Sequence, residues 1–164
     1  MAKKPEKRIS LSDISELTGR RADDAATAAR IILPVADGES EWNKFARQLV
    51  ESIVRQLLKI DTLLCSDVRE SMERRRDEAE AIAAAASDDK ERSDALARVE
   101  LFSRLLSLRA TKRELFRICS SAHEDELREL LAGTRAAALL KGHPNMLASV
   151  RAVASQHTQP SNPA

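Results

Sequence analysis

The residues of this chain that could do chemistry are three histidines, two cysteines and many acidic and basic side chains. His123, His143 and His157 are scattered, and none has a second metal ligand at a convincing helical spacing. Cys65 and Cys119 fit no metal-binding spacing and lie among apolar neighbours, as small core residues do. We therefore predict no metal site and interpret the histidines as surface or capping residues.

The carboxylates and glycines also carry no catalytic signature. Glu124 and Asp125 stand at the start of a predicted helix, where they complement the helix dipole without any catalytic role. The sequence has no G-x-x-x-x-G-K-[ST] loop, which excludes a self-contained P-loop ATPase, and it lacks the glycines of a dinucleotide-binding loop. No nucleophile can be paired with a base, so we predict that the chain is not an enzyme and holds no cofactor.

Basic side chains are the remaining candidates for a functional site. Acidic residues outnumber basic ones from Asp67 to Asp94, and the balance reverses from Arg98 to Arg117. If a folded lobe gathers these cations, it presents a patch that contacts phosphate groups. The residues predicted to bind nucleic acid are Lys112, Arg113, Arg117, Arg135, Lys141 and Arg151, with Arg74, Arg75 and Arg76 as a second candidate strip.

The alternative is a solvated charged face that binds nothing. The formal net charge is only +1, so the chain has no net field that attracts phosphate. Aromatic residues make up 2% of the chain, and single-strand binders usually stack bases on such side chains. Glu114 can also pair with Arg117 one helical turn away. Composition alone therefore favours the solvated face, and any DNA contact would be weak, salt-sensitive and independent of base sequence.

The elements that must position these residues are helices. Hydrophobic residues make up 43% of the 164 residues, and with so few aromatics the core must consist of Ala, Leu, Ile and Val. Only four glycines and five prolines interrupt a chain rich in Ala, Leu, Arg and Glu, which favour helices. No apolar run approaches the roughly 20 residues needed to span a bilayer, so we expect no direct membrane contact.

A long amphipathic helix over residues 40–60 is the clearest predicted element. Ser40 is a good N-cap, because its hydroxyl can accept a hydrogen bond from an unpaired N–H of the first turn. One apolar stripe follows, formed by Trp42, Phe45, Ala46, Leu49, Ile53, Leu57 and Ile60. Trp42→Ala is expected to cost about 3–5 kcal/mol if the ring is buried.

Residues 1–33 are expected to form an N-terminal arm, partly disordered or in short helices at 10–17 and 23–33.

A helical hairpin is predicted over residues 66–109. Ser66 can cap a first helix to about Ala86, and the following SDDK sequence offers a break before a second helix to about Arg109. The first helix has a thin stripe formed by Val68, Met72, Ala79, Ile82 and Ala86. The second has a broad apolar surface formed by Leu96, Val99, Leu101, Phe102, Leu105, Leu106 and Leu108. We expect the first helix to pack lightly and the second to have neighbours on two sides.

Short capped helices are predicted for the last third. Thr111 and Glu114 can form a capping box, and Ser121 and Glu124 can form another. Gly133 fits the left-handed position after a helix. The predicted core, shared with the long helix, consists of Leu49, Ile53, Leu57, Leu115, Phe116, Leu127, Leu130 and Leu131.

The predicted fold class is all-α. We expect a compact multi-helix lobe with one long amphipathic helix, a helical hairpin and several short capped helices. Pro144 suits the first turn of a last helix, and residues 156–164 are predicted to be disordered.

Three stretches of the chain carry a family resemblance. GESEWNKFARQLVESIVRQLL has an acidic turn that leads into a Trp opening a long helix, and ATKRELFRICSSAHEDELRELLAGTRAAALL and NMLASVRAVAS follow in order. Together they resemble the all-α domain of conjugative type IV coupling proteins of the TraD/TrwB kind. The matching residues of the second stretch are Thr111, Arg113, Glu114, Leu115, Phe116, Asp125, Leu127, Arg128, Leu131, Gly133 and Thr134. The hairpin interrupts the resemblance and is long for the family.

This resemblance implies a role in the conjugative transfer of plasmid DNA. In the family the domain is an insertion in a hexameric, membrane-anchored, DNA-translocating ATPase, where it caps the cytoplasmic face of the ring and is implicated in recognising relaxase–DNA cargo. The present chain resembles the excised domain over residues 34–155, with its ends where the nucleotide-binding domain would continue. The resemblance implies a non-catalytic cytoplasmic domain of a type IV secretion system, hexameric only through the parent ATPase.

Two classes of partner stay open at this point. The expected partners are DNA and a relaxase or accessory relaxosome protein. The alternative is a protein-docking module, in which the acidic, Ala-rich hairpin binds the relaxase and no DNA is contacted. Deletion of residues 66–95 followed by a relaxase pull-down distinguishes the two.

Overall fold

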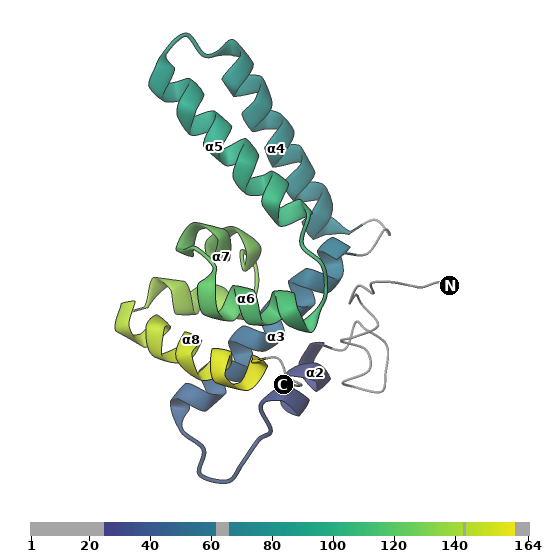
Figure 1. The fold of residues 1–164 in the computed structure, drawn as a ribbon, viewed down its shortest axis with the longest axis vertical. Helices are drawn as coiled ribbons and strands as arrows, with labels where there is room; N and C mark the ends of the chain where they lie inside the picture. Colours follow the sequence, from purple (N-terminus) through teal and green to yellow (C-terminus); the bar gives the residue numbers. More distant parts are fainter. Residues whose placement is uncertain (1–24, 62–65, 143, 160–164) are drawn as a thin grey trace, which may run out of the picture. The chain divides into compact units, whose positions relative to one another are not determined.

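A computed structural model describes residues 25–61, 66–142 and 144–159 (Figure 1). These residues form only helices, turns and short connections, which confirms the predicted all-α fold class. The elements are α2 (Ala25–Ile32), α3 (Glu41–Asp61), α4 (Asp67–Ala85), α5 (Asp89–Leu106), α6 (Lys112–Ser121), α7 (Glu124–Leu130), the 3₁₀ helix η1 (Arg135–Lys141) and α8 (Pro144–Thr158). The predicted helix at residues 10–17 lies outside the described residues, as do Cys65 and His143.

The chain divides into two compact units. Unit 1 comprises residues 1–58 and 109–164, and unit 2 comprises Lys59–Leu108. Unit 1 holds α2, α6, α7, η1, α8 and most of α3, whereas α4 and α5 pack along each other as the predicted hairpin in unit 2 (Figure 1). The last turn of α3 belongs to unit 2, where the Ser66 hydroxyl donates to the Lys59 carbonyl at 2.9 Å.

The helix α3 is the central element of unit 1. Ser40 caps it as predicted, because the Asn43 N–H donates to Ser40 Oγ at 3.2 Å. Within unit 1 its buried residues are Ala46, Leu49, Val50, Ser52, Ile53, Val54, Gln56, Leu57 and Leu58. At about 100° per residue these positions cover roughly two thirds of the helix circumference. The single predicted stripe is therefore too narrow, and α3 needs neighbours on several sides.

Phe116 is the one member of the predicted core that is not buried, and Trp42 of the predicted apolar stripe is exposed. Trp42 is 43% exposed, because it precedes the buried part of α3 by a full turn. Phe116 is half-buried. The buried face of α6 consists of Leu115, Ile118 and Cys119, and Phe116 points about 100° away from Leu115 on the same helix.

A buried amide joins α3 to α7. The Gln56 Nε2–H donates to the Leu130 carbonyl at 2.7 Å, and both residues are buried. Leu130 is the last residue of α7, where carbonyl groups have no partner within the helix. One hydrogen bond therefore satisfies both a buried side chain and a helix end.

The connection from α2 to α3 is held by Arg47. Its guanidinium donates to the Leu33 carbonyl at 2.7 Å and to the Pro34 carbonyl at 3.2 Å. It also donates to the Glu39 carboxylate, with Nη1 at 3.1 Å, and the Asn43 amide donates to the same carboxylate at 3.2 Å. The hydrogen bonds from Arg47 and then Asn43 lower the pKa of Glu39 from 4.5 to about 2.

The first capping box of the last third is half correct. Thr111 Oγ1 accepts from the Glu114 N–H at 2.9 Å, as predicted. The reciprocal bond is wrong, because the Glu114 carboxylate accepts from Arg117 and the Thr111 N–H donates to the Arg109 carbonyl.

Later helix boundaries depart from the prediction at two points. Ser121 ends α6, and His123 precedes α7 without a side-chain cap, so the second predicted capping box is wrong. Gly133 has a φ of +82°, which confirms the left-handed conformation after α7. The last helix begins at Pro144 as predicted and continues to the buried Thr158, so the start of the predicted disordered tail is helical. Residues 160–164 of that tail lie outside the described residues.

Unit 2 has a core of two kinds. One half of the hairpin buries large side chains such as Met72 and Phe102. The half nearer the α4–α5 turn buries only Ala79, Ala83 and Ala95 on the two helices. Small side chains remove little apolar surface from water, so the half near the turn is the more weakly stabilised.

Two apolar residues of the hairpin lie outside its buried seam. Ile82 is 49% exposed and Leu96 is 52% exposed. Both were expected in the apolar stripes of the hairpin. They lie beside the buried alanine seam rather than on it, because Ala79, Ala83 and Ala95 take the central positions.

The burial difference along α3 predicts different costs for two truncations. Ile53→Ala should lower the free energy of unfolding by about 2–5 kcal/mol, since its side chain is fully buried. Trp42→Ala should cost roughly half of what a buried ring costs, about 1.5–2.5 kcal/mol. Urea unfolding followed by far-ultraviolet circular dichroism measures both, and equal costs for the two variants would contradict the burial pattern.

The Glu39 carboxylate predicts a specific acid sensitivity. Its pKa lies near 2 in the folded chain and near 4.5 in the unfolded chain, so it stabilises the fold above pH 4.5 and loses this effect as pH falls toward 2. Glu39→Gln should flatten the pH dependence of the unfolding free energy in that window. Glu41→Gln, whose carboxylate is an exposed partner of Lys44, is the control and should leave the dependence nearly unchanged.

Candidate nucleic-acid interface

Two of the residues predicted to bind nucleic acid lie at the start of α6. The Thr111 side chain fixes the start of this helix, and Lys112 and Arg113 are its first two residues. Both side chains are exposed, and no carboxylate of the described residues lies within ion-pair distance of either. The positive end of the helix dipole disfavours cations at this position. Lys112 and Arg113 therefore carry positive charge that nothing in the described part of the chain compensates.

Two more predicted cations lie at the ends of η1. Thr134 precedes this 3₁₀ helix and Gly142 follows it. Arg135 is its first residue and Lys141 its last, and both are exposed. At about 2 Å per residue the two backbone positions are roughly 12 Å apart. Neither side chain forms an ion pair among the described residues.

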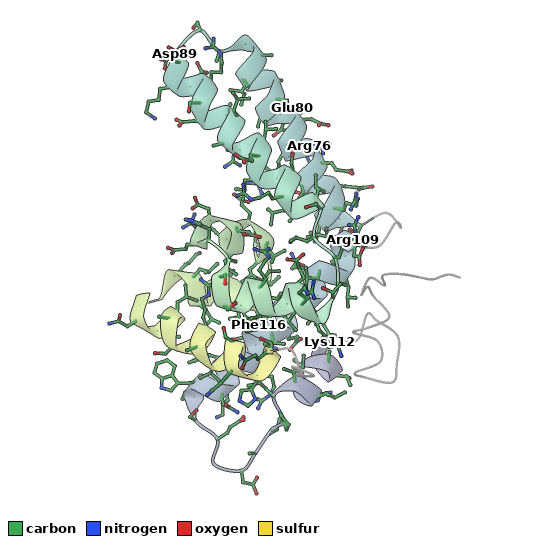
Figure 2. All side chains as sticks on the ribbon, in the orientation of Figure 1. Arg76, Glu80, Asp89, Arg109, Lys112 and Phe116 are labelled. Atoms are coloured by element: carbon green, nitrogen blue, oxygen red, sulfur yellow. The ribbon has the colours of Figure 1, made fainter. Side chains whose placement is uncertain are left out.

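These two pairs of cations do not form one continuous patch. The helices α6 and α8 pack side by side and run in opposite directions, and η1 leads into the start of α8 (Figure 1). Lys112 therefore lies at the end of α6 away from η1 (Figure 2). Ten residues of α6 span about 15 Å, so Lys112 lies about that far from the other end of the helix. A ligand that touches both must be extended.

Arg117 is used inside unit 1. Its Nε–H donates to Glu114 at 2.6 Å, and its Nη2–H donates to Glu126 at 2.7 Å. Glu126 lies on α7 and is buried, so removal of its partner would leave a buried charge unpaired. Arg117 thus joins α6 to α7, and two carboxylates neutralise its charge.

Arg151 is also used inside unit 1. From α8 it donates to the Cys119 carbonyl at 2.9 Å and to the Ile118 carbonyl at 3.0 Å. These carbonyls belong to the last turn of α6, where a cation also meets the negative end of the helix dipole. Burial lowers the pKa of Arg151 below its ordinary value, although a guanidinium stays charged at neutral pH.

The second predicted strip, in unit 2, has only one exposed arginine without a partner among the described residues. The Arg75 guanidinium lies 4.7 Å from the centroid of the Phe102 ring, a cation–π distance. Arg76 lies 3.5 Å from Asp77. Arg74 is exposed and has no such partner. The run of three arginines therefore does not act as one basic strip.

The described residues also bear on the metal, thiol and membrane questions that the sequence raised. They contain no group of three or more His, Cys, Asp or Glu side chains placed to hold a metal ion. Burial raises the pKa of the Cys119 thiol to about 12, so this buried cysteine stays protonated. No helix in the described ranges is long and apolar enough to cross a bilayer.

Sequence reasoning missed one surface feature, a groove between α4 and α5 in unit 2. The groove forms because alanines of α4 and α5 lie on the faces where the two helices meet. The only sequence signal was the thin, Ala-rich stripe of the first hairpin helix, which indicates light packing.

Comparisons with known proteins found no match: no family model, no curated protein and no solved structure matches this chain.

The structural role of Arg151 predicts a stability effect that an exposed arginine lacks. Arg151→Met should lower the free energy of unfolding by about 1.5–3 kcal/mol, because two carbonyls lose a charged donor. Arg113→Met is the matched control and should change it by no more than about 0.5 kcal/mol. Urea unfolding measures both, and an unchanged Arg151→Met midpoint would contradict the role given to this side chain.

Proposed function

We propose that this chain is a non-catalytic substrate-recognition domain of a conjugative coupling protein, which contacts relaxosome DNA or the relaxase bound to it. The proposal rests on the resemblance to the all-α domain of TraD/TrwB-type coupling proteins. It assigns no catalytic step to this chain, because ATP hydrolysis would belong to the parent translocase on the cytoplasmic side of the membrane.

The observation that carries the proposal is where the resembling stretches fall. They span residues 38–58, 110–140 and 145–155, and all three belong to unit 1. The residues that interrupt the resemblance form unit 2 by themselves. A shared domain with an inserted hairpin accounts for this division.

The matching residues also have the roles that a shared fold requires. Thr111 caps α6, and Leu115, Leu127 and Leu131 are fully or almost fully buried. Gly133 takes the left-handed conformation between α7 and η1. These positions are compatible with a shared fold, although Thr caps, buried Leu and left-handed Gly are favoured in any helical domain.

The proposed DNA contact uses the four exposed cations of α6 and η1. Lys112 and Arg113 form one pair, and Arg135 and Lys141 form the other. Cations without carboxylate partners can neutralise phosphates and release counterions. Because Lys112 lies at the end of α6 away from η1, the arrangement suits the extended backbone of a nucleic acid better than a compact anion. In this proposal Arg117 and Arg151 hold unit 1 together and do not touch DNA.

A salt titration of DNA binding tests the proposal. Fluorescence anisotropy with single- and double-stranded oligonucleotides should show weak binding, and log affinity should fall linearly with log salt. Lys112→Ala/Arg113→Ala should reduce the magnitude of that slope by about 1.4 for single strands and about 1.8 for duplex. Arg135→Ala/Lys141→Ala should have a similar effect.

The control double variant is Lys44→Ala/Arg55→Ala. It removes two exposed cations of α3 that pair with Glu41 and Glu51. It should leave the slope nearly unchanged. Binding that ignores salt, or no binding at low salt, would reject the DNA contact and leave the protein-docking alternative. An equal loss in the control would reject the residues assigned here.

A further inference from the structure

The hairpin of unit 2 has a groove that the proposed DNA contact does not use. The groove has a volume of about 250 Å³ and lies between α4 and α5. It is lined by Arg75, Glu78, Ala79 and Ile82 from α4 and by Glu91, Asp94, Ala95 and Arg98 from α5. All of these residues belong to unit 2. From Arg75 to Ile82 the groove follows about two helical turns, or roughly 10 Å.

Part of the groove is an apolar site formed by small side chains, called the apolar seat below. Ala79 and Ala95 are buried in its floor, and Ile82 is 49% exposed at its edge. In packed helices a large side chain of one helix fills the space between side chains of its neighbours. Alanines on both helices leave that space open, so an apolar side chain of a third helix can enter beside Ile82.

Acidic groups flank this seat. Glu78 lies one turn before Ile82 on the same face of α4, and Glu91 lines the groove from α5. Neither carboxylate has an ion-pair partner among the described residues, whereas Asp94 pairs with Lys90 at 2.9 Å. Residues 77–94 contain seven acidic and two basic side chains. The half of the hairpin near the turn is therefore negatively charged.

We propose that this groove docks a basic amphipathic helix of a partner protein. One apolar side chain of that helix packs against Ile82 between the alanines, and Lys or Arg side chains one turn away reach Glu78 and Glu91. The footprint of about two turns is small, so the contact is weak and exchanges quickly. It uses residues of unit 2 alone, and it holds whether or not unit 1 binds DNA.

Charge selects this occupant over two others. A second copy of the hairpin would bring its own seven acidic residues against the same surface, and like charges across an interface oppose association. Nucleic acid is disfavoured in the half near the turn, because its phosphates would face the acidic excess of residues 77–94, Glu78 and Glu91 included. The two arginines that line the groove, Arg75 and Arg98, both lie over the Phe102 ring, at 4.7 and 5.2 Å. A basic helix offers the apolar side chain beside Ile82 and charge opposite to that of Glu78 and Glu91.

Peptide binding to the full chain tests the proposal. The probe is a fluorescein-labelled helical peptide of 14 residues with Leu on one face and Lys on the other, and a second peptide carries Glu in place of Lys. Anisotropy should show that the Lys peptide binds and the Glu peptide does not. Ile82→Asp and the double variant Glu78→Lys/Glu91→Lys should each weaken binding about tenfold or more.

Matched controls lie on the same two helices. Leu96→Asp changes an apolar residue of similar exposure that does not line the groove, and Glu80→Lys changes an exposed carboxylate near Glu78 (Figure 2). Both should leave the affinity within about twofold. Circular dichroism verifies that each variant stays helical, so a lost fold cannot be mistaken for a lost site.

Three outcomes overturn the proposal. Equal losses in Ile82→Asp and Leu96→Asp would show that the peptide does not use the groove. Equal binding of the Glu peptide would remove the role of charge. Self-association in analytical ultracentrifugation that Ile82→Asp abolishes would make a second copy the occupant. None of these results bears on DNA binding by Lys112 and Arg113, so the two proposals fail separately.

Discussion

The burial of α3 over most of its circumference is the constraint on which unit 1 depends. A helix with one apolar stripe can lie on a surface, but a helix buried on several sides must be covered by other segments. Its polar groups must then find partners inside, as the Gln56 amide does at the Leu130 carbonyl. That bond joins residues 74 positions apart. Unit 1 therefore forms only when the chain before and after unit 2 comes together.

Arginines contribute to this closure as much as apolar side chains do. Arg47 holds the chain between α2 and α3, Arg117 joins α6 to α7, and Arg151 joins α8 to the end of α6. Each donates charged hydrogen bonds to carbonyl or carboxylate oxygens of another segment. The number of cations in a sequence segment therefore overstates the charge that is left for a ligand. Among the cations predicted to bind nucleic acid, those of unit 1 that stay exposed without a carboxylate partner among the described residues lie in α6 and η1.

Local signals in the sequence predicted the helices, and distant contacts decided the rest. Ser40, Ser66 and Thr111 were read as caps because an N-cap bonds to residues within its own first turn, and all three act so. Arg151 could not be separated from Arg113 in this way, because its acceptors lie 32 and 33 positions earlier in the chain. The sequence could not predict the exposure of Trp42 either, for a related reason. Spacing shows which residues share a face, but it does not show how far along the helix the neighbours extend.

The exposed groups proposed to bind partners are basic in unit 1 and acidic in the hairpin of unit 2. This difference follows from the interactions that stabilise each unit. In unit 1 the carboxylates of Glu114 and Glu126 form ion pairs with Arg117. Lys112 and Arg113 therefore have no carboxylate partner among the described residues. The hairpin near its turn is held by alanines and helix caps such as Asp88, and its acidic residues stay on the surface. Fields of exposed charges fade over about 10 Å at 0.1 M salt, so an exposed charge acts mainly on ligands within about that distance. Because the hairpin carries its own caps and seam, its surface can change without altering the core of unit 1.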